Sequence, residues 1–231
     1  MKRNCQPELM DDPNLDARRH RHALRGLARV NAISLSTRTV WKPIRRLAKE
    51  LGTSRLRVLD VATGGGDIPL GIWKRSRRAN LDLEIMGVDI SDEALAVARQ
   101  RCEESSAAID FQQLDVFAEP LPDGYDVVVS SLFLHHLSEE DAGALLSKMA
   151  KATRHSVLVN DLVRSRLNLV LVFLAMRLLT TSKVVHTDGP LSVKAAFTRE
   201  EARGLAVQTG LDTAIVRSRF PCRYLLEWRS G

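Results

Sequence analysis

The sequence predicts an α/β fold built on a doubly wound, mostly parallel sheet. Through the middle of the 231 residues, short branched apolar segments alternate with longer segments of helical character. Such alternation is typical of a parallel sheet that is covered by helices on both faces. The last two strand-like segments have no helical segment between them, which predicts an antiparallel hairpin at one edge.

Seven segments have the apolar, β-branched character of strands. They are residues 57–61, 83–89, 109–114, 125–130, 156–161, 213–219 and 224–228. The first leads into the run Gly64–Gly66, and the last two flank Phe220 and Pro221. A strand followed directly by glycines is a common place for a ligand to approach the backbone, so this junction is of particular interest.

Helices are predicted before and between these strands. One helix is expected over residues 16–51, where Gly52 ends it, and an apolar helix is expected over residues 164–181. Other helices begin at recognisable N-cap residues, which are Ser91, Ser138 and Thr198. The last two of these are followed by acidic residues in the pattern of a capping box.

Composition excludes collagen-like, disulfide-scaffold and wholly disordered proteins, but it does not decide the partner. The net charge of +6 favours anionic partners such as RNA or a membrane surface, yet solvated helix faces account for it equally well. Cys5, Cys102 and Cys222 form no paired motif, so neither a zinc site nor a disulfide framework is predicted. The N-terminus lacks the apolar core of a secretory signal, and the apolar run 167–179 is too short to span a bilayer. A cytoplasmic protein is therefore expected.

The candidate ligand site is residues 58–69, VLDVATGGGDIP, because ligands of open α/β sheets bind beyond the carboxyl ends of the strands. Glycines expose backbone N–H groups there, and the following helix N-terminus attracts an anion. A dinucleotide fingerprint fails, since Pro69 occupies the third glycine position counted from Gly64 and Gly66. Asp60 would repel a pyrophosphate and attract an ammonium group. A ligand with both an ammonium and a carboxylate fits this loop.

Two further acidic residues extend the site along the sheet. Asp89 ends the second strand and can accept hydrogen bonds from both ribose hydroxyls. Asp115 follows the third strand and can accept from an adenine amine, with Phe117 against the base. An amino acid, a ribose and an adenine without phosphates describe S-adenosylmethionine. The alternatives are local roles, as a turn former for Asp60 or Asp115 and as a helix cap for Asp89.

With these motifs, the sequence resembles the class I S-adenosylmethionine-dependent methyltransferases over about residues 55–231. Asp60, Gly64 and Gly66 match the first motif, although Ala62 stands where the first glycine is usual. The stretch YDVVVSSLFLHHLSEED resembles the fourth-strand region with its His-His-Leu turn. The resemblance implies a Rossmann-like sheet of seven strands. It also implies S-adenosylmethionine as cofactor, with S-adenosylhomocysteine (SAH) as product, bound by Asp60, Ala62, Thr63, Gly64, Gly66, Asp89, Ile90, Asp115, Val116 and Ser130.

Within that family, the chain resembles small-molecule methyltransferases of quinone biosynthesis and polyketide tailoring. The segments LVNDLVRSR, HTDGPLSVKAAFT and FPCRYLLEW carry this resemblance. It implies methylation of an oxygen or carbon of a small, apolar, phenolic or quinone-like acceptor in secondary metabolism. We expect a helical lid at residues 1–52 and a methyltransferase domain at 53–231, with a helical substrate cap inserted at about 162–196. The oligomeric state stays open.

Three histidines are candidate general bases for such an acceptor. His135 and His136 follow the fourth strand, and His186 follows the apolar helix, with Asp188 to orient it. A histidine pKa of about 6.5 allows it to take a proton from a phenol near neutral pH. The alternatives are packing or solvation for the first pair and a polar surface turn for His186. No metal site is predicted, because the acidic residues form no convincing cluster for a divalent cation.

Two other functions are left open by the sequence. An RNA methyltransferase would suit the positive charge, but the fourth strand ends in SSLF rather than in an Asn/Asp-Pro-Pro-aromatic turn. No dedicated RNA-binding module is visible, so nucleic acid is not the expected partner. A non-catalytic protein that binds S-adenosylmethionine would keep the glycine loop and Asp89 without transferring a methyl group. Detection of a methylated product separates this last possibility from an enzyme.

Overall fold

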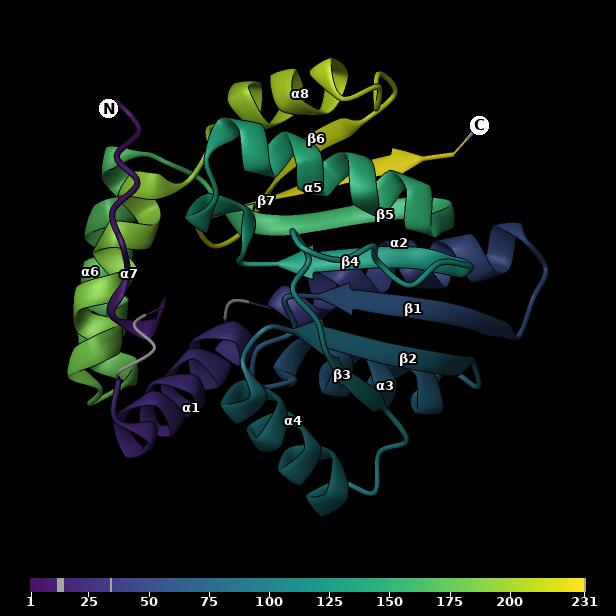
Figure 1. Cartoon of the computed structure of the whole chain (residues 1–231), viewed down its shortest axis with the longest axis horizontal. Coiled ribbons are helices and arrows are strands. Elements are labelled where there is room, and N and C mark those ends of the chain that lie inside the picture. The colour runs from purple at the N-terminus through teal and green to yellow at the C-terminus, as the bar shows by residue number, and fades with distance from the viewer. Residues whose placement is uncertain (12–14, 34, 231) are drawn as a thin grey trace.

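A seven-stranded sheet forms the centre of the molecule, in the order β3-β2-β1-β4-β5-β7-β6 (Figure 1). The computed structural model describes residues 1–11, 15–33 and 35–230. The strands are β1 (Arg55–Val61), β2 (Asp82–Asp89), β3 (Asp110–Gln113), β4 (Tyr125–Ser131), β5 (Thr153–Leu162), β6 (Ile215–Arg219) and β7 (Arg223–Arg229). Each overlaps a strand that the sequence predicts, and most differ from the prediction by one to three residues at an end.

The sheet is parallel except for one strand, which confirms the predicted fold class. β1 pairs in parallel with β2 and β4, β2 with β3, and β4 with β5. β7 runs antiparallel to both β5 and β6, so the hairpin lies at the edge of the sheet as expected. β6, rather than the last strand of the chain, is the outermost strand on that side.

Helices cover both faces of the sheet. They are α1 (Ala17–Ile33), α2 (Ser36–Glu50), α3 (Asp67–Arg78), α4 (Asp92–Glu104), α5 (Glu139–Ala152), α6 (Arg166–Leu179), α7 (Lys183–Ala195) and α8 (Arg199–Gln208), with 3-10 turns η1 (Leu9–Asp11) and η2 (Leu134–His136). Apolar residues of α2 and α3 pack in one core cluster with β1, whereas those of α5 and α8 pack in another. Successive residues of β1 belong to different clusters: Val58 packs in the first and Leu59 in the second. Both are fully buried, as expected of a central parallel strand.

The predicted helix over residues 16–51 is two helices. Leu35 has φ 56°, a left-handed backbone conformation that interrupts the helix, and α1 and α2 then serve different parts of the molecule. Val40 and Ile44 of α2 lie fully buried against the sheet. Ala23 and Val30 of α1 instead pack with α6 and α7. Residues 1–52 thus contribute to both the sheet cover and the group of helices α1, α6 and α7, which we call the cap.

The cap lies beyond the carboxyl ends of the parallel strands (Figure 1). Helix α7 of the cap lies within the expected helical insertion at about 162–196, although the sequence predicted one helix there, over residues 164–181, and left a polar turn at His186 as an alternative. Gly189 is needed for packing: a Cβ there would lie 2.8 Å from Cγ of Met176 on α6. Close contact between α6 and α7 therefore stabilises a helix that local propensity disfavours. No helix among the described residues is long and apolar enough to cross a membrane.

The predicted N-caps are present, with one difference. The Ser91 and Ser138 side chains accept from the backbone N–H groups of Ala94 and Asp141. Thr198 forms the full reciprocal capping box with Glu201. At Ser138 the capping box is not formed, because the hydroxyl donates to the Asp141 carboxylate at 2.8 Å.

Gly66, at the start of α3, is expected to tolerate no side chain. Its φ is +70°, and a Cβ would lie 2.8 Å from the Cβ of Ala98. We predict that Gly66→Ala lowers the free energy of unfolding by about 2–4 kcal/mol, from backbone strain plus steric conflict. Gly52→Ala is the matched control, because φ is +62° but nothing lies within 4 Å of its Cβ. Urea denaturation should show that the control lowers the free energy of unfolding by only about 1 kcal/mol. Equal losses in both variants would contradict the packing argument.

Candidate active site

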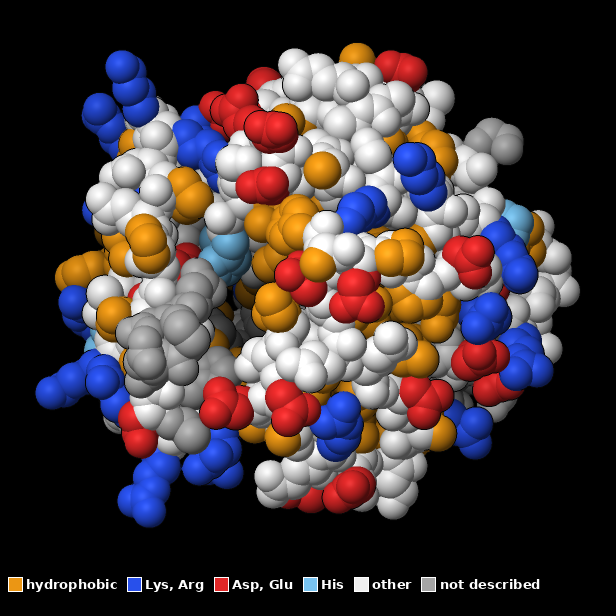
Figure 2. All heavy atoms as spheres, viewed as in Figure 1, with side chains coloured by type: hydrophobic (Ala, Val, Ile, Leu, Met, Phe, Trp, Pro, Cys, Tyr) orange, Lys and Arg blue, Asp and Glu red, His pale blue; other side chains and the backbone are white. Residues whose placement is uncertain are grey.

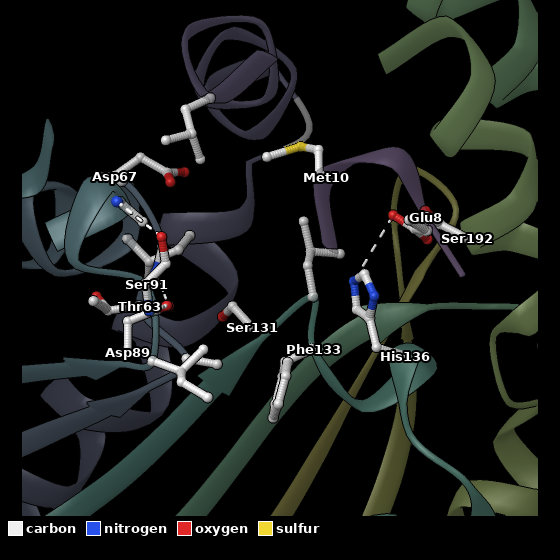
Figure 3. A pocket seen from close by; sticks show the side chains of 18 of the residues that line it. Glu8, Met10, Thr63, Asp67, Asp89, Ser91, Ser131, Phe133, His136 and Ser192 are labelled. Carbon is white, nitrogen blue, oxygen red and sulfur yellow. Dashed lines mark hydrogen bonds and ion pairs between the residues drawn. The ribbon is translucent and has the colours of Figure 1, made fainter. Parts of the chain in front are cut away.

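A cavity of about 880 Å³ lies between the carboxyl ends of the strands and the cap. Figure 3 shows two groups of polar side chains in it: Thr63, Asp67, Asp89 and Ser91 on one side, and Glu8, His136 and Ser192 on the other. Met10, Ser131 and Phe133 lie between the two groups. The cavity therefore has two polar ends, joined by a largely apolar middle.

The first end is the glycine loop after β1. Ala62 and Gly64 have φ values of 56° and 55°, a left-handed conformation in both cases. This explains why a glycine is usual at position 62, because an L residue there adds strain of about 1 kcal/mol. The Gly64 N–H donates to Oδ2 of Asp89 at 2.7 Å, and the Ser91 N–H donates to Oδ1 at 2.9 Å. Asp89 thus ties the loop to β2 while it lines the cavity.

Asp60 is a buried carboxylate at the same end. Its Oδ2 accepts from the Thr63 hydroxyl at 2.6 Å, whereas Oδ1 is buried with no hydrogen-bond partner. Burial, with smaller contributions from nearby Asp67 and Asp89 and against the effect of the Thr63 hydrogen bond, raises the pKa of Asp60 to about 7. A buried, incompletely paired carboxylate at a cavity wall fits a cationic ligand group.

The adenine-side residues also line the cavity. Ile90, Asp115, Val116 and Phe117 all belong to its wall. Oδ1 of Asp115 accepts from the Phe117 N–H at 2.8 Å, which is the local turn role that the sequence left as an alternative. The second carboxylate oxygen has no such bond to this turn, so the local and the ligand-binding roles are compatible.

Two of the predicted cofactor residues lie outside the cavity wall. Gly66 begins α3 behind the loop, and its N–H donates to the Thr63 carbonyl at 3.1 Å. Ser130 is fully buried within β4. The next residue, Ser131, lines the cavity instead, because successive side chains of a strand point to opposite sides. For these two positions, the structure differs from the expected direct contact.

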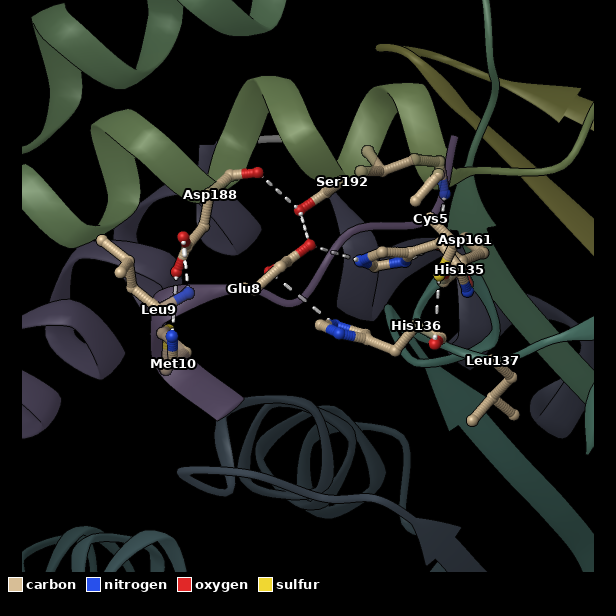
Figure 4. Close-up of polar contacts among 12 residues, drawn as sticks. Cys5, Glu8, Leu9, Met10, His135, His136, Leu137, Asp161, Asp188 and Ser192 are labelled. Carbon is tan, nitrogen blue, oxygen red and sulfur yellow. Dashed lines mark hydrogen bonds and ion pairs between the residues drawn. The ribbon is translucent and has the colours of Figure 1, made fainter. Parts of the chain in front are cut away.

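The second end is a cluster of histidines and carboxylates (Figure 4). His135 Nδ1 lies 2.6 Å from Oδ1 of Asp161, and the His135 backbone N–H donates to Oδ2 at 3.1 Å. The carboxylate of Glu8 lies 3.8 Å from Nε2 of His135 and 3.9 Å from Nε2 of His136. The Ser192 hydroxyl donates to Oε1 of Glu8 at 2.6 Å. Four segments of the chain therefore meet at this cluster.

Buried charges in this cluster compensate one another. Burial would raise the pKa of Asp161, but the charge and hydrogen bond of His135, together with the Leu162 N–H, lower it overall. Donor atoms of Glu8, His135 and His136 lie within 4.8 Å of one another, close enough to share a cation. The pairs just described account for the arrangement without one.

His186 lies apart from the other two histidines. Its Nε2 is 2.7 Å from the carbonyl oxygen of Thr180, and it is not among the residues of the cavity wall. Asp188 lines the cavity but accepts the backbone N–H groups of Leu9 and Met10 at 2.9 and 3.1 Å. The expected pairing of His186 with Asp188 as base and orienting residue has no support in this geometry.

Sequence reasoning missed Glu8, Asp161 and Ser192. Asp161 had a usable signal, since it is an acidic residue near the end of a buried parallel strand, like Asp60 and Asp89. Glu8 and Ser192 had none, because no local pattern shows that the N-terminal segment meets α7 beside the histidine turn. Their roles depend on contacts between residues more than a hundred positions apart.

Known proteins resemble this chain in both sequence and fold. Residues 58–156 match a family described as a methyltransferase domain. A demethylmenaquinone methyltransferase of Thermus thermophilus is 33% identical over 119 residues, which are 49% of this chain and 52% of that protein. A ubiquinone biosynthesis O-methyltransferase of Azoarcus is 33% identical over 103 residues, 43% and 42% of the respective chains. The matches thus span about half the length of these relatives or less.

A solved structure extends the likeness to most of the chain. The magnesium protoporphyrin IX methyltransferase of Synechocystis with bound SAH has a TM-score of 0.60 at 18% identity, over 88% of this chain and 86% of that one. Residues 58–156 therefore match a methyltransferase domain, and the chain as a whole has the fold of this methyltransferase structure. S-adenosylmethionine would suit the first end of the cavity, because its ammonium group could pair with the buried, incompletely bonded carboxylate of Asp60.

Asp89 is expected to contribute strongly to binding of S-adenosylmethionine and its product SAH. We predict that Asp89→Ala lowers affinity for SAH at least about tenfold, or about 1.4 kcal/mol, because the ribose loses its acceptor and the loop loses its tie to β2. Calorimetric titration measures this directly. Asp82→Ala, at the exposed start of the same strand, is the control and should bind normally. Unchanged affinity in folded Asp89→Ala would contradict the ribose assignment.

Cofactor binding should also depend on pH through Asp60. The ligand ammonium requires the carboxylate form, and the pKa of Asp60 is about 7 before binding. Affinity for SAH should therefore fall as the pH falls, roughly tenfold between about pH 8 and about pH 6. Asp60→Asn should bind more weakly and lose this dependence. A wild-type protein with a flat pH profile would show that Asp60 does not face the ammonium.

Proposed function

We propose that this chain transfers the sulfonium methyl of S-adenosylmethionine to a hydroxyl oxygen of a small, apolar, phenolic or quinone-like acceptor. One observation carries the proposal: a single cavity joins the glycine loop to a buried histidine–carboxylate cluster. The first end suits the methyl donor, and the second suits an acidic hydroxyl. A ring carbon beside that hydroxyl is the alternative atom, because a phenolate is nucleophilic there too. The two relatives named for quinone methylation support this acceptor class.

In this proposal, the cofactor occupies the first end of the cavity. Asp60 faces the ammonium, and the carboxylate lies beside the glycine loop and the N-terminus of α3, while the Gly64 N–H stays bonded to Asp89. Asp89 accepts from the ribose hydroxyls. Asp115 accepts from the adenine amine, with Ile90, Val116 and Phe117 packed against the base. Thr63 and Ala62 shape the loop. Gly66 and Ser130 support it from outside the cavity wall and do not contact the cofactor.

The acceptor lies between the cofactor and the cluster. The cavity wall in this region is mainly apolar and comes from the N-terminal segment, the β4–η2 turn and the cap: Met10, Leu15, Leu132, Phe133, Leu162, Met176 and Val185. These side chains exclude water and suit an aromatic or alkyl acceptor. The N-terminal segment and the inserted helices α6 and α7 would act as lid and substrate cap. A lined cavity of this kind aligns donor and acceptor for in-line displacement, which supplies about 7–11 kcal/mol of barrier lowering.

His136 is the group that we propose takes the acceptor proton. It lines the cavity and keeps 22% of its side chain exposed, whereas His135 is nearly fully buried and is held by Asp161. The Glu8 carboxylate, 3.9 Å from His136 Nε2, would stabilise the imidazolium that forms. His135 positions Glu8 from the other side. His186, outside the cavity, has no part in transfer.

A panel of substituted phenols and hydroquinones with different alkyl tails tests the proposal. Each is incubated with S-adenosylmethionine, SAH release is measured, and the product is analysed by mass spectrometry and NMR. At least one acceptor should yield an O-methylated product. Binding of SAH with no transfer to any member of the panel would favour a non-catalytic protein.

Removal of the base should separate transfer from binding. We predict that His136→Ala lowers kcat about 10²-fold or more while the Kd for SAH is unchanged, because the histidine contacts only the acceptor end. His186→Ala is the matched control and should keep full activity. Steady-state kinetics and calorimetry check both. An undiminished rate in His136→Ala would leave alignment alone as the source of catalysis.

A further inference from the structure

Helix α6 has an exposed apolar stripe that nothing in the chain covers among the described residues. Six large side chains are solvent-exposed: Leu167 (68%), Val170 (56%), Leu171 (42%), Phe173 (42%), Leu174 (51%) and Leu178 (84%). Most are spaced three or four positions apart, so they share one face of the helix. The opposite face is buried, with Val172 and Met176 packed against the rest of the cap.

Helix α6 and the neighbouring helix α1 are positively charged. Helices α1 and α6 contact one another and together carry seven arginines and no Asp or Glu. All seven arginines are exposed: Arg18, Arg19, Arg21, Arg25, Arg29, Arg166 and Arg177. Arg177 stacks on the ring of Phe173, with 3.5 Å from its guanidinium carbon to the ring centroid. In Figure 2, hydrophobic side chains and Lys or Arg side chains lie together along the side of the molecule that the cap forms.

We propose that this face of the cap docks on the surface of a bilayer that contains anionic phospholipids. The leucine stripe would enter the boundary between headgroups and acyl chains, and the arginines would pair with lipid phosphates. A helix of this kind lies in the interface rather than across the membrane, in agreement with the absence of any spanning helix among the described residues. Charge complementarity thus selects an anionic lipid surface as the partner.

A second copy of the chain fits this face less well. A symmetric dimer would bring the same arginine-rich surface of each copy together. Neither α1 nor α6 carries a carboxylate to neutralise the opposing arginines. Lipid phosphates supply the missing negative charge, and acyl chains supply the apolar surface.

The position of this face gives docking a consequence for the site. Met176 is part of α6 and lines the cavity, and Leu24 and Val30 of α1 line it too. Docking would therefore leave only the cap helices between the lipid and the cavity, which gives an apolar acceptor a short path from the bilayer. Only this consequence rests on the proposed function. Docking itself does not depend on methyl transfer.

Vesicle co-sedimentation of the full chain tests the proposal. Vesicles are made of phosphatidylcholine alone or of equimolar phosphatidylcholine and phosphatidylglycerol. The protein should partition into the anionic vesicles about tenfold or more better than into the neutral ones, and added salt should reduce this preference. Equal partition into both, or none into either, would overturn the proposal.

Variants identify the face and guard against misfolding. Leu174→Glu/Leu178→Glu and Arg25→Glu/Arg29→Glu should each lower binding to anionic vesicles about tenfold. Val207→Glu, at an exposed apolar residue on α8 (44%), is the control and should bind as wild type. Since both leucines are at the surface, thermal unfolding and SAH binding should be unchanged. The assignment would be overturned if the control also lost vesicle binding, or if the leucine variant bound vesicles as well as wild type.

Two readouts separate this proposal from its rival and from the proposed function. Analytical ultracentrifugation of wild type and the leucine variant shows whether the stripe joins two copies. A stable wild-type dimer that the leucine variant dissociates would overturn lipid docking. Vesicle binding without methyl transfer would leave docking intact and contradict only the proposed function.

Discussion

The carboxylates Asp60, Asp89 and Asp161 are positioned by the parallel arrangement of β1, β2, β4 and β5. Parallel strands end at the same edge of the sheet, so residues far apart in the chain converge there. For this reason Asp60 and Asp89 lie together at the cofactor end, and Asp161 lies next to the histidine turn η2. The register of the pairing places Asp60 opposite Gly87, so Asp89 lies two residues further toward the carboxyl end of the sheet, and Asp161 lies three residues beyond Leu158, which is level with Asp60. Without it, neither the loop nor the histidine cluster would have its buried carboxylate.

The N-terminal segment completes what the sheet begins. Arg3 donates to the carbonyl oxygens of Leu137 and Ala195, at 2.5 and 2.7 Å, and the N–H groups of Leu9 and Met10 donate to Asp188. These bonds join the histidine turn to the cap and hold Glu8 between them. The proposed catalytic cluster therefore takes one of its members, Glu8, from this segment. Lid and chemistry are thereby coupled.

The fold could be predicted from sequence because its determinants are local. Strand alternation, the glycine run after β1 and the N-cap residues each act within a few positions. The failures have non-local causes. Gly189 and Pro190 indicate a turn, but packing of α7 against Met176 makes a helix. The break at Leu35 follows from α1 and α2 packing on different partners.

The two ends of the site also differ in how far the sequence predicts them, because one is built from local motifs and the other from distant residues. The cofactor end is one contiguous motif plus strand-terminal acids, so Asp60, Gly64 and Asp89 were accessible to sequence reasoning. Ser131 lines the cavity where Ser130 was expected, because the sequence near the end of β4 does not show which of two successive side chains faces the cavity. The acceptor end assembles His136 with Glu8 and Ser192, which share no local pattern. Its chemistry became visible only in three dimensions.

The account requires that the loop after β1 hold S-adenosylmethionine rather than a dinucleotide. Calorimetric titration of the purified protein with SAH, with NADH as the control, tests this most directly. The buried carboxylate of Asp60 and the Pro69 position both predict saturable binding of SAH and no binding of NADH. Binding of NADH, or no binding of either ligand, would contradict the account at its centre.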